Sequence, residues 1–85
     1  MTRRIYASDV GTYLDRGGHT TSEGPKWTAG YRVRQDSPRT VRVHHDGPDE
    51  LDFLDQYART LQARGYFVYV TRPARRRPHL RITHP

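Results

Sequence analysis

The sequence lacks cysteine entirely and contains no long run of hydrophobic residues. Without cysteine, neither a disulfide nor a thiolate metal site can form. No apolar stretch approaches the roughly 20 residues that a membrane-spanning helix needs, and no apolar signal-peptide core follows Met1. We therefore expect a cytoplasmic protein that is not inserted into a membrane.

Hydrophobic residues are also scarce, at 33% of the 85 positions, which leaves material for one thin core. A chain of this length buries about 60–65% of the surface that it exposes when unfolded. A deep enzymatic cleft between two lobes is therefore not expected. We predict an N-terminal segment over residues 1–26, with a short helix and a mobile loop, and a single α+β domain over residues 27–85.

The formal net charge is +6, which favours a polyanionic partner such as nucleic acid. Of the 15 basic residues only Lys26 is a lysine, and this skew toward arginine is typical of a GC-rich coding sequence. The placement of the arginines is therefore better evidence of function than their number.

The stretch from Asp46 to Arg72 predicts one helix followed by one buried strand. Asp46 or Gly47 fits the N-cap position, with Pro48 near the first helical position. Gly65 fits a left-handed position after the last turn. Between these ends, apolar residues recur at helical spacing: Leu51, Phe53, Leu54, Tyr57, Ala58 and Leu61.

The first 26 residues carry weaker signals. Residues 2–6 fit either an edge strand or a disordered arm. A short helix capped by Ser8 or Asp9 would follow. Its apolar face would comprise Val10, Tyr13 and Leu14. Residues 17–25 have the composition of a loop, and we expect them to be mobile.

Residues 27–45 alternate between apolar and polar positions, which predicts an antiparallel hairpin. The inner face would carry Trp27, Ala29, Tyr31, Val33, Val41 and Val43, and the outer face Thr28, Arg32, Arg34, Thr40, Arg42 and His44. Residues 35–39 would form the turn, since Asp, Ser and Pro each favour turns. With Val33 opposite Val41, Arg32 would lie opposite Arg42. Trp27 and Tyr31, like Tyr57, are expected in the core.

The segment from Tyr66 to Arg72 is rich in aromatic and β-branched residues and pairs most simply with His79 to Thr83. The expected register is Val70 opposite Leu80 and Val68 opposite Ile82, with both pairs pointing at the helix. The outward residues would then be Phe67, Tyr69, Thr71, His79, Arg81 and Thr83. The opposite orientation, with Phe67 and Tyr69 inside, stays open because a strand that is apolar on both faces has no usable periodicity.

These elements give the order β-β-α-β-β, with an uncertain short element at the N-terminus. We predict an α+β fold of two layers, in which a mostly antiparallel four-stranded sheet has one main helix packed on one face. The strand order stays open, as does the question of whether the second hairpin lies beside the first or extends toward another chain.

The outer sheet face would be basic and the helix side acidic. Carboxylates concentrate on or beside the helix, at Asp46, Asp49, Glu50, Asp52 and Asp55. From Tyr66 to Pro85 there are five arginines and no side-chain acid. Arginines interleaved with exposed aromatic residues suit single-stranded nucleic acid, because arginine binds phosphates and aromatic rings stack on bases. A solvated polar sheet face is the alternative explanation of the same residues.

We predict a small nucleic-acid-binding module whose contacts go mainly to phosphates. The candidate phosphate-binding residues are Arg32, Arg34, Arg42, Arg75, Arg76, Arg77 and Arg81, and Tyr69 is the candidate for base stacking. Residues 75–77 form an arginine run in a loop between two prolines, for which an ordinary exposed loop is the alternative. DNA and RNA are both eligible partners, and sequence specificity should be modest.

The five histidines do not define a catalytic or metal site. His44 and His45 are adjacent in a strand, so their side chains point to opposite faces and do not readily share one metal ion. We assign no catalytic residue, no metal and no cofactor, and a non-enzymatic role is favoured. One alternative is a small nuclease that uses His44 or His79 with an arginine.

A further alternative is a protein-interaction module or a homodimeric accessory protein of a phage or mobile element. Such a protein would pair through an exposed edge of the sheet and would have no nucleic-acid role.

Overall fold

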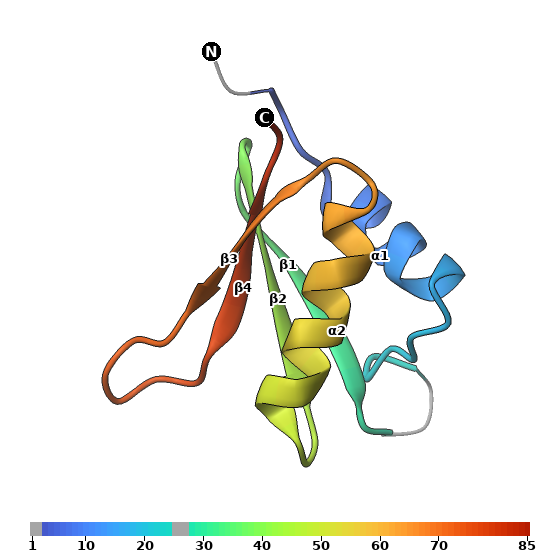
Figure 1. The fold of residues 1–85 in the computed structure, drawn as a ribbon, viewed down its shortest axis with the longest axis vertical. Coiled ribbons are helices and arrows are strands. Elements are labelled where there is room, and N and C mark those ends of the chain that lie inside the picture. Colours follow the sequence, from blue (N-terminus) through green and yellow to red (C-terminus); the bar gives the residue numbers. More distant parts are fainter. Residues whose placement is uncertain (1–2, 25–27) are drawn as a thin grey trace.

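The computed structural model describes residues 3–24 and 28–85, which contain two helices and four strands. In chain order these are α1 (Ala7–Arg16), β1 (Gly30–Ser37), β2 (Thr40–Asp46), α2 (Glu50–Gln62), β3 (Phe67–Thr71) and β4 (His79–Thr83). The strands form one antiparallel sheet, and both helices cover the same face of it (Figure 1). The predicted two-layer α+β fold is therefore confirmed, and the uncertain N-terminal element is a helix. Neither helix is long and apolar enough to cross a lipid bilayer, among the residues that the structure describes.

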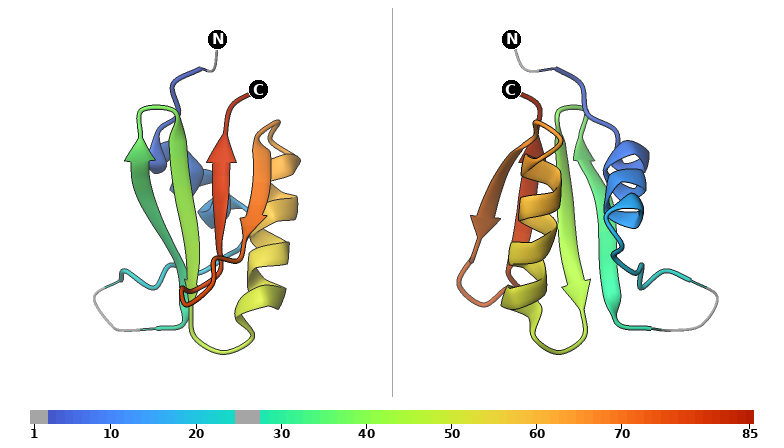
Figure 2. Two further views of the ribbon diagram at one scale, coloured as in Figure 1. Left: turned by 90° about the vertical axis from the view of Figure 1, so that its left-hand side faces the viewer. Right: turned by 45° about the vertical axis from the view of Figure 1, so that its right-hand side comes forward.

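The four strands lie in the order β1-β2-β4-β3, so the second hairpin lies beside the first (Figure 2). β2 and β3 run in the same direction, because each is antiparallel to β4, which lies between them. The connection through α2 is therefore a crossover between parallel strands, with the helix packed back on the sheet. β4 then returns along β3 and fills the gap. This topology leaves β1 and β3 as the two edges of the sheet.

The core lies between the sheet and the two helices. Its buried apolar residues are Ile5, Val10, Leu14, Tyr31, Val41, Val43, Leu54, Tyr57, Ala58, Leu61, Tyr66, Leu80 and Ile82. Tyr31 and Tyr57 are buried as predicted, whereas Trp27 lies outside the described residues. Val10 and Leu14 confirm the predicted apolar face of the N-terminal helix. α1 packs against both α2 and β1, so this helix shares the core of the sheet.

Helix α2 begins later than the sequence predicts. Asp46 still belongs to β2, where it pairs with Gly30, and the following residues form the turn into the helix. The N-cap is Asp49, with a left-handed φ of 59° and no capping hydrogen bond from its side chain. The prediction of an N-cap at Asp46 or Gly47 is therefore wrong. Leu51 lies in the first helical turn and is 45% exposed, so its place in the apolar stripe is also wrong.

The first hairpin has a shorter turn than predicted. β1 continues through Ser37, and only Pro38 and Arg39 connect it to β2. The prediction that residues 35–39 all form the turn is therefore wrong. Ala29 precedes β1 and is exposed, so its predicted place on the inner face is wrong as well.

The shorter turn shifts the register of this hairpin by two residues. The pairs are Val33 with Val43, Arg34 with Arg42, and Arg32 with His44, and the register is irregular between Gln35 and Ser37. The predicted pairs of Val33 with Val41 and Arg32 with Arg42 are wrong. A two-residue shift preserves the alternation of side chains, so the arginines still lie on the outer face.

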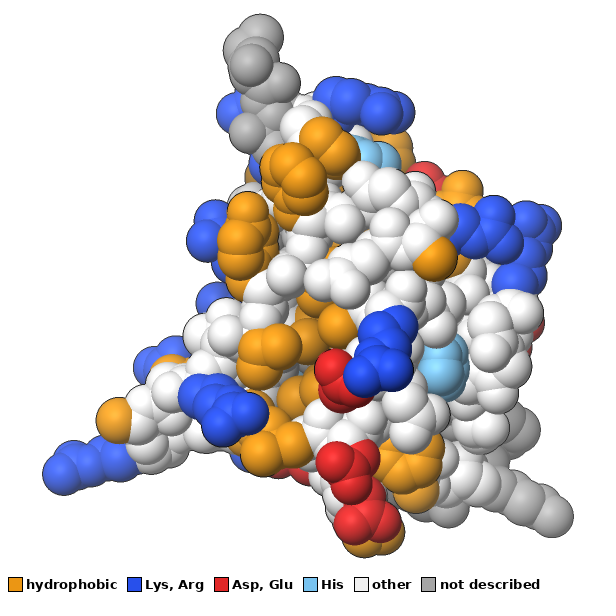
Figure 3. Space-filling view, in the orientation of Figure 1, with side chains coloured by type: hydrophobic (Ala, Val, Ile, Leu, Met, Phe, Trp, Pro, Cys, Tyr) orange, Lys and Arg blue, Asp and Glu red, His pale blue; other side chains and the backbone are white. Residues whose placement is uncertain are grey.

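The second hairpin has the predicted register, Val70 opposite Leu80 and Val68 opposite Ile82. Phe67 and Tyr69 alternate with the helix-facing positions and are 50% and 52% exposed on the other face of the sheet. The strand is not buried as predicted, because β3 is an edge, and Val70 on the helix side is also 52% exposed. Figure 3 shows hydrophobic side chains gathered along β3 and in the strip beside α2.

Candidate nucleic-acid interface

The helices leave the opposite face of the sheet uncovered (Figure 2). Cross-strand pairing arranges the side chains of this face in rows. One row crosses all four strands through Arg34, Arg42, Arg81 and Tyr69. The next row holds Arg32 and His44, followed by His79 and Thr71. The outer residues of both hairpins therefore lie on one surface, which we call the open face.

The outer arginines of β1 and β2 are paired with carboxylates. The three ion pairs are Arg32 Nε to Asp46 Oδ2 at 3.4 Å, Arg42 Nε to Asp36 Oδ2 at 3.2 Å, and Arg34 Nη1 to Glu23 Oε1. Each arginine on this half of the open face thus has a negative partner. The predicted separation into a basic sheet side and an acidic helix side is wrong here, because the carboxylate of Asp46 lies beside Arg32 rather than on the helix.

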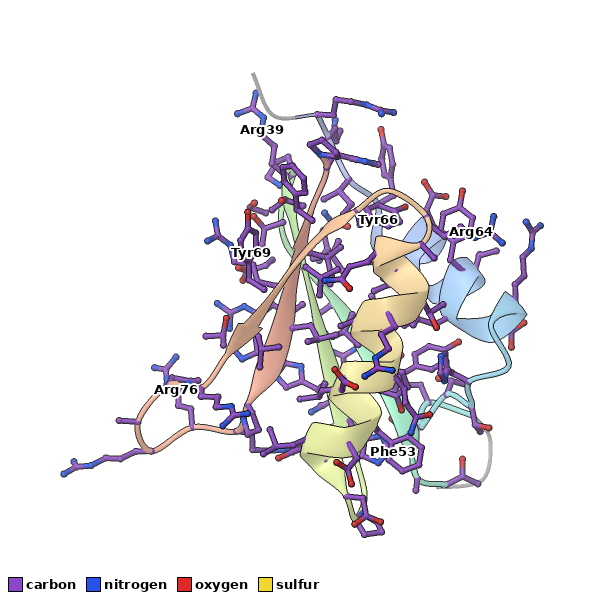
Figure 4. All side chains as sticks on the ribbon, viewed as in Figure 1. Arg39, Phe53, Arg64, Tyr66, Tyr69 and Arg76 are labelled. Carbon is purple, nitrogen blue, oxygen red and sulfur yellow. The ribbon has the colours of Figure 1, made fainter. Side chains whose placement is uncertain are left out.

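Three arginines near β3 and β4, in contrast, are not paired with carboxylates in the described part of the chain. Arg39, Arg76 and Arg81 form no ion pair with any residue in the described ranges 3–24 and 28–85. Figure 4 shows Arg39, Arg76 and Tyr69 on the side of the sheet away from α2. Positive charge on the open face is therefore concentrated around the second hairpin and the turn of the first.

A shallow groove of about 450 Å³ lies over the first residues of β3 and the last residues of β4. It is lined by Arg39, Thr40, Phe67, Tyr69, Arg81, Thr83, His84 and Pro85, and we call it the aromatic groove. Phe67 and Tyr69 lie two positions apart on β3, so both rings are on the same side of the strand. Two half-exposed rings next to arginines form a surface on which planar, negatively charged ligands can stack.

A second groove of about 440 Å³ adjoins the first and shares Thr40 and Arg81 with it. Its other lining residues are Asp36, Arg42, Thr71, Pro73, Arg76 and His79, and we call it the arginine groove. Guanidinium and hydroxyl groups dominate its polar lining. Guanidinium groups bind phosphate oxygens with charge-assisted, often bidentate hydrogen bonds, so this groove suits a phosphate.

His44 and His79 lie side by side on the open face, with ring centroids 5.1 Å apart and a 30° tilt. Burial lowers the pKa of His44, and nearby His79, Arg32 and Arg77 lower it further against the opposing effect of Asp46. Its Nδ1 atom is buried and has no hydrogen-bond partner among the described residues. His79 is only 9% exposed, so its ring offers little surface to a substrate. No group of three or more metal-ligating side chains exists in the described part of the chain.

Arg77 anchors the loop between β3 and β4. Its guanidinium lies 2.8 Å from Glu50 Oε2 and 3.0 Å from Asp46 Oδ1, and it also donates to the carbonyl of His45. Hydrogen bonds to Glu50 and Asp46 raise the pKa of Arg77. This arginine therefore ties the loop to the start of α2, while the two preceding arginines are exposed on the loop.

On the helix side, His45 is buried at 1% exposure in a polar cluster that sequence reasoning missed. Its Nε2 lies 3.1 Å from the carbonyl of Pro48, and its Nδ1 lies 2.7 Å from the hydroxyl of Tyr57. A carbonyl only accepts, so Nε2 donates and Nδ1 accepts from Tyr57. Burial, with smaller effects from Tyr31 and Asp46, raises the pKa of Tyr57 to about 12. His45 lies two positions after Val43 in the same strand, so it shares the helix side with Val41 and Val43. This alternation is the sequence signal that could have predicted its burial.

Sequence reasoning found part of the open face. Of the predicted binding residues, Tyr69, Arg76 and Arg81 line the two grooves, and Arg75 is exposed on the loop. Arg42 lines the arginine groove but is paired with Asp36, and Arg32, Arg34 and Arg77 also bind carboxylates. Arg39 was missed as a site residue because it was assigned to a long turn. Its position in a two-residue turn places it at the end of the aromatic groove instead.

The fold and this surface define a class: a small two-layer α+β domain whose uncovered sheet face is aromatic and basic over one half. No known protein family, no curated protein and no solved structure matches this chain. The functional assignment therefore rests on the geometry and chemistry of the open face.

Proposed function

We propose that the open face binds single-stranded nucleic acid in the cytoplasm, with a base against the aromatic groove and an adjoining phosphate in the arginine groove. One observation carries this proposal. Half-exposed aromatic rings and arginines without an ion pair lie in two adjoining grooves that share Arg81. This is the combination that single strands require, since their bases need a stacking surface and their phosphates need cations.

Single strands are favoured over duplexes because a duplex hides the faces of its bases. Only an unstacked base can lie flat on Phe67 or Tyr69, and such stacking is worth about 1–3 kcal/mol per base. Contacts to phosphates do not depend on sequence, so specificity for particular bases should be modest. Arg75 and Arg76 on the loop add phosphate contacts at the end of the arginine groove, whereas Arg77 has a structural role in this proposal.

Fluorescence anisotropy with labelled single-stranded and duplex DNA and RNA, at two salt concentrations, tests the proposal. We expect single strands to bind in the micromolar range or tighter, more strongly than duplexes, and less strongly as salt rises. Tyr69→Ala should weaken single-strand binding by about 5- to 150-fold, the loss of one stacked base.

Tyr6→Ala is the matched control. Tyr6 is 51% exposed, close to the 52% of Tyr69, but it lies against Arg4 and outside both grooves. This variant should bind like the unmodified protein. No binding at low salt, or the same loss of affinity in both tyrosine variants, would reject the proposal.

Interaction with a protein through a sheet edge is a second candidate function. The specific observation that favours it is the exposure of Phe67, Tyr69 and Val70 on one edge strand. The two functions are compatible, because edge pairing uses the backbone of β3 while Phe67 and Tyr69 project onto the open face.

A further inference from the structure

The two edges of the sheet are covered to different extents. The loop before β1 runs along its edge, where the amide of Tyr31 donates to Thr20 and the amide of Ser22 donates to Tyr31, at 2.8 and 2.9 Å. Further along β1, the side chain of Gln35 accepts from the amide of Ala7 and donates to the carbonyl of Ile5. The backbone and side chains of β1 are therefore engaged by residues 5–7 and 20–22.

The edge at β3 has no such cover. Within residues 3–24 and 28–85, β3 pairs with β4 and with no other strand. In the described part of the chain, three of the five exposed large hydrophobic side chains belong to this five-residue strand: Phe67, Tyr69 and Val70. No charged residue or proline interrupts residues 67–71. Natural proteins usually protect an edge with such residues, so an edge without them is suited to pairing with another strand.

The sequence of β3 is close to a palindrome about Tyr69. In an antiparallel pairing with a second copy, Tyr69 would face Tyr69, each Val68 would face Val70, and each Phe67 would face Thr71. The aromatic residues would share one face of the combined sheet and the valines the other. A two-fold symmetric contact requires this kind of self-complementary surface.

We propose that the protein forms a symmetric homodimer through antiparallel pairing of β3 with β3 of a second copy, centred on Tyr69. This proposal rests on the second candidate function above. It identifies the protein partner as a second copy of the chain and fixes the register of the pairing at Tyr69. It covers Val70 with Val68 of the second copy and joins two four-stranded sheets into one of eight strands. The open faces of the two copies then form one continuous surface.

Charge and area determine how strong this dimer is. The pairing sets no two arginines opposite each other within the strand, and Arg72 at its end faces Tyr66 of the second copy, a pairing without like-charge repulsion. Two five-residue strands bury less than the roughly 1,200–2,000 Å² of a standard stable interface. The dimer should therefore dissociate in the micromolar range or above, so its population depends on protein concentration.

Sedimentation equilibrium of the full chain without nucleic acid tests the dimer directly. The mass should rise from that of the 10.0 kDa chain toward twice this value as the concentration increases from micromolar to millimolar. Val70→Lys should keep the protein monomeric, because two lysines would be placed in the interface. Leu51→Lys is the control, since Leu51 is exposed to 45% but belongs to α2. Circular dichroism checks that both variants are folded.

Disulfide trapping tests the register. The chain has no cysteine, so Tyr69→Cys introduces a single thiol that can form only an intermolecular disulfide. Opposed residues of an antiparallel pair have Cα atoms about 4.5–5.5 Å apart, within the range of a disulfide. Tyr69→Cys should cross-link faster than Tyr6→Cys. A monomer at millimolar concentration would overturn the dimer. Equal masses for the Val70→Lys and Leu51→Lys variants, or equal cross-linking rates for Tyr69→Cys and Tyr6→Cys, would overturn it as well. None of these results would affect the proposal of nucleic-acid binding.

Discussion

Both halves of the sheet alternate between apolar residues on the helix side and polar or aromatic residues on the open face, yet they differ in charge balance and in their edges. In the β1–β2 half, each outer arginine is paired with a carboxylate, and the edge is covered by residues 5–7 and 20–22. In the β3–β4 half, Arg76 and Arg81 have no ion pair among the described residues, and the edge strand exposes aromatic rings.

This difference shows that the pattern of a strand predicts which face a side chain occupies but not whether it is free to bind. Whether an arginine is already paired depends on carboxylates that the alternation of the strand does not indicate. Glu23 reaches Arg34 from the loop before β1, and Asp36 reaches Arg42 from the end of that strand. The outer arginines of β1 and β2 are thereby neutralised by carboxylates of the protein itself, whereas Arg76 and Arg81 have no ion pair among the described residues.

The largest expected effect comes from breaking the covered edge. A Cβ atom on Gly30 would lie 2.1 Å from the carbonyl oxygen of Thr20, so the covering loop passes directly over this glycine. Gly30→Ala should push the loop away and destabilise the protein by about 1–3 kcal/mol, the usual cost of overpacking. For a domain of this size, the melting temperature should fall by roughly 4–24 °C, which differential scanning calorimetry measures.

Gly11→Ala is the matched control for this prediction. Gly11 lies inside α1, and a Cβ atom there would meet no other atom within 4 Å. Because alanine is about 1 kcal/mol better than glycine in a helix, this variant should be more stable than the unmodified protein. Equal melting temperatures for the Gly30 variant and the unmodified protein would show that the loop does not hold the edge.

The parts of the fold that could be predicted from the sequence depend on strong local signals. The register of the second hairpin follows from Val68 and Val70 on one strand and Leu80 and Ile82 on the other, with prolines marking the loop. The left-handed conformation of Gly65, with φ of +90°, follows from glycine after a helix. These signals lie within a few residues of the structure that they specify.

The parts that could not be predicted depend on contacts between distant residues or on turn length. Arg77 and Glu50 are 27 positions apart, so no local pattern shows that this arginine is structural. Asp36, Ser37 and Pro38 all favour turns, and composition does not say which two residues connect the strands. The candidate site was therefore predicted as a face, while its division into occupied and available arginines required the structure.

A smaller effect should distinguish the two halves within one row of the open face. Arg34 and Arg81 both belong to this row, but Arg34 binds Glu23 and Arg81 has no ion pair in the described part of the chain. If each lost phosphate contact lowers the salt dependence by about 0.7 for a single strand, Arg81→Ala should flatten the slope of log affinity against log salt by that amount. Arg34→Ala should leave the slope unchanged.

The comparison of Arg34 with Arg81 also predicts a variant with increased affinity. Glu23→Gln removes the negative partner of Arg34 and should release this arginine for a phosphate, which raises affinity and steepens the salt slope. Anisotropy titrations at several salt concentrations measure all three variants. Equal slopes for the Arg34 and Arg81 variants would mean that the ion pairs do not decide which arginines bind.

The smallest expected effect is a pH dependence at the seam between the halves, where His44 of β2 lies beside His79 of β4. The pKa of His44 is lowered on folding, chiefly by burial, so the unfolded chain binds this proton more readily than the folded one. Stability contributed by neutral His44 is therefore fully present above the unfolded pKa of about 6.5 and is lost as the pH falls through the lower folded value.

Stability and binding should consequently respond to acid with opposite signs. Between about pH 7.5 and about pH 5.5, the melting temperature should fall, while protonation of His44 adds positive charge to the open face and strengthens binding of single strands. His44→Gln, compared with the unmodified protein at both pH values, should reduce both changes. The pKa of nearby Asp46 is lowered by hydrogen bonds and that of Arg77 is raised by them, so both side chains remain charged over this range and do not produce the difference. If the His44→Gln variant kept the full pH dependence of melting temperature and affinity, this dependence would come from other histidines. His19 and His84 are examples, since burial also lowers their pKa values.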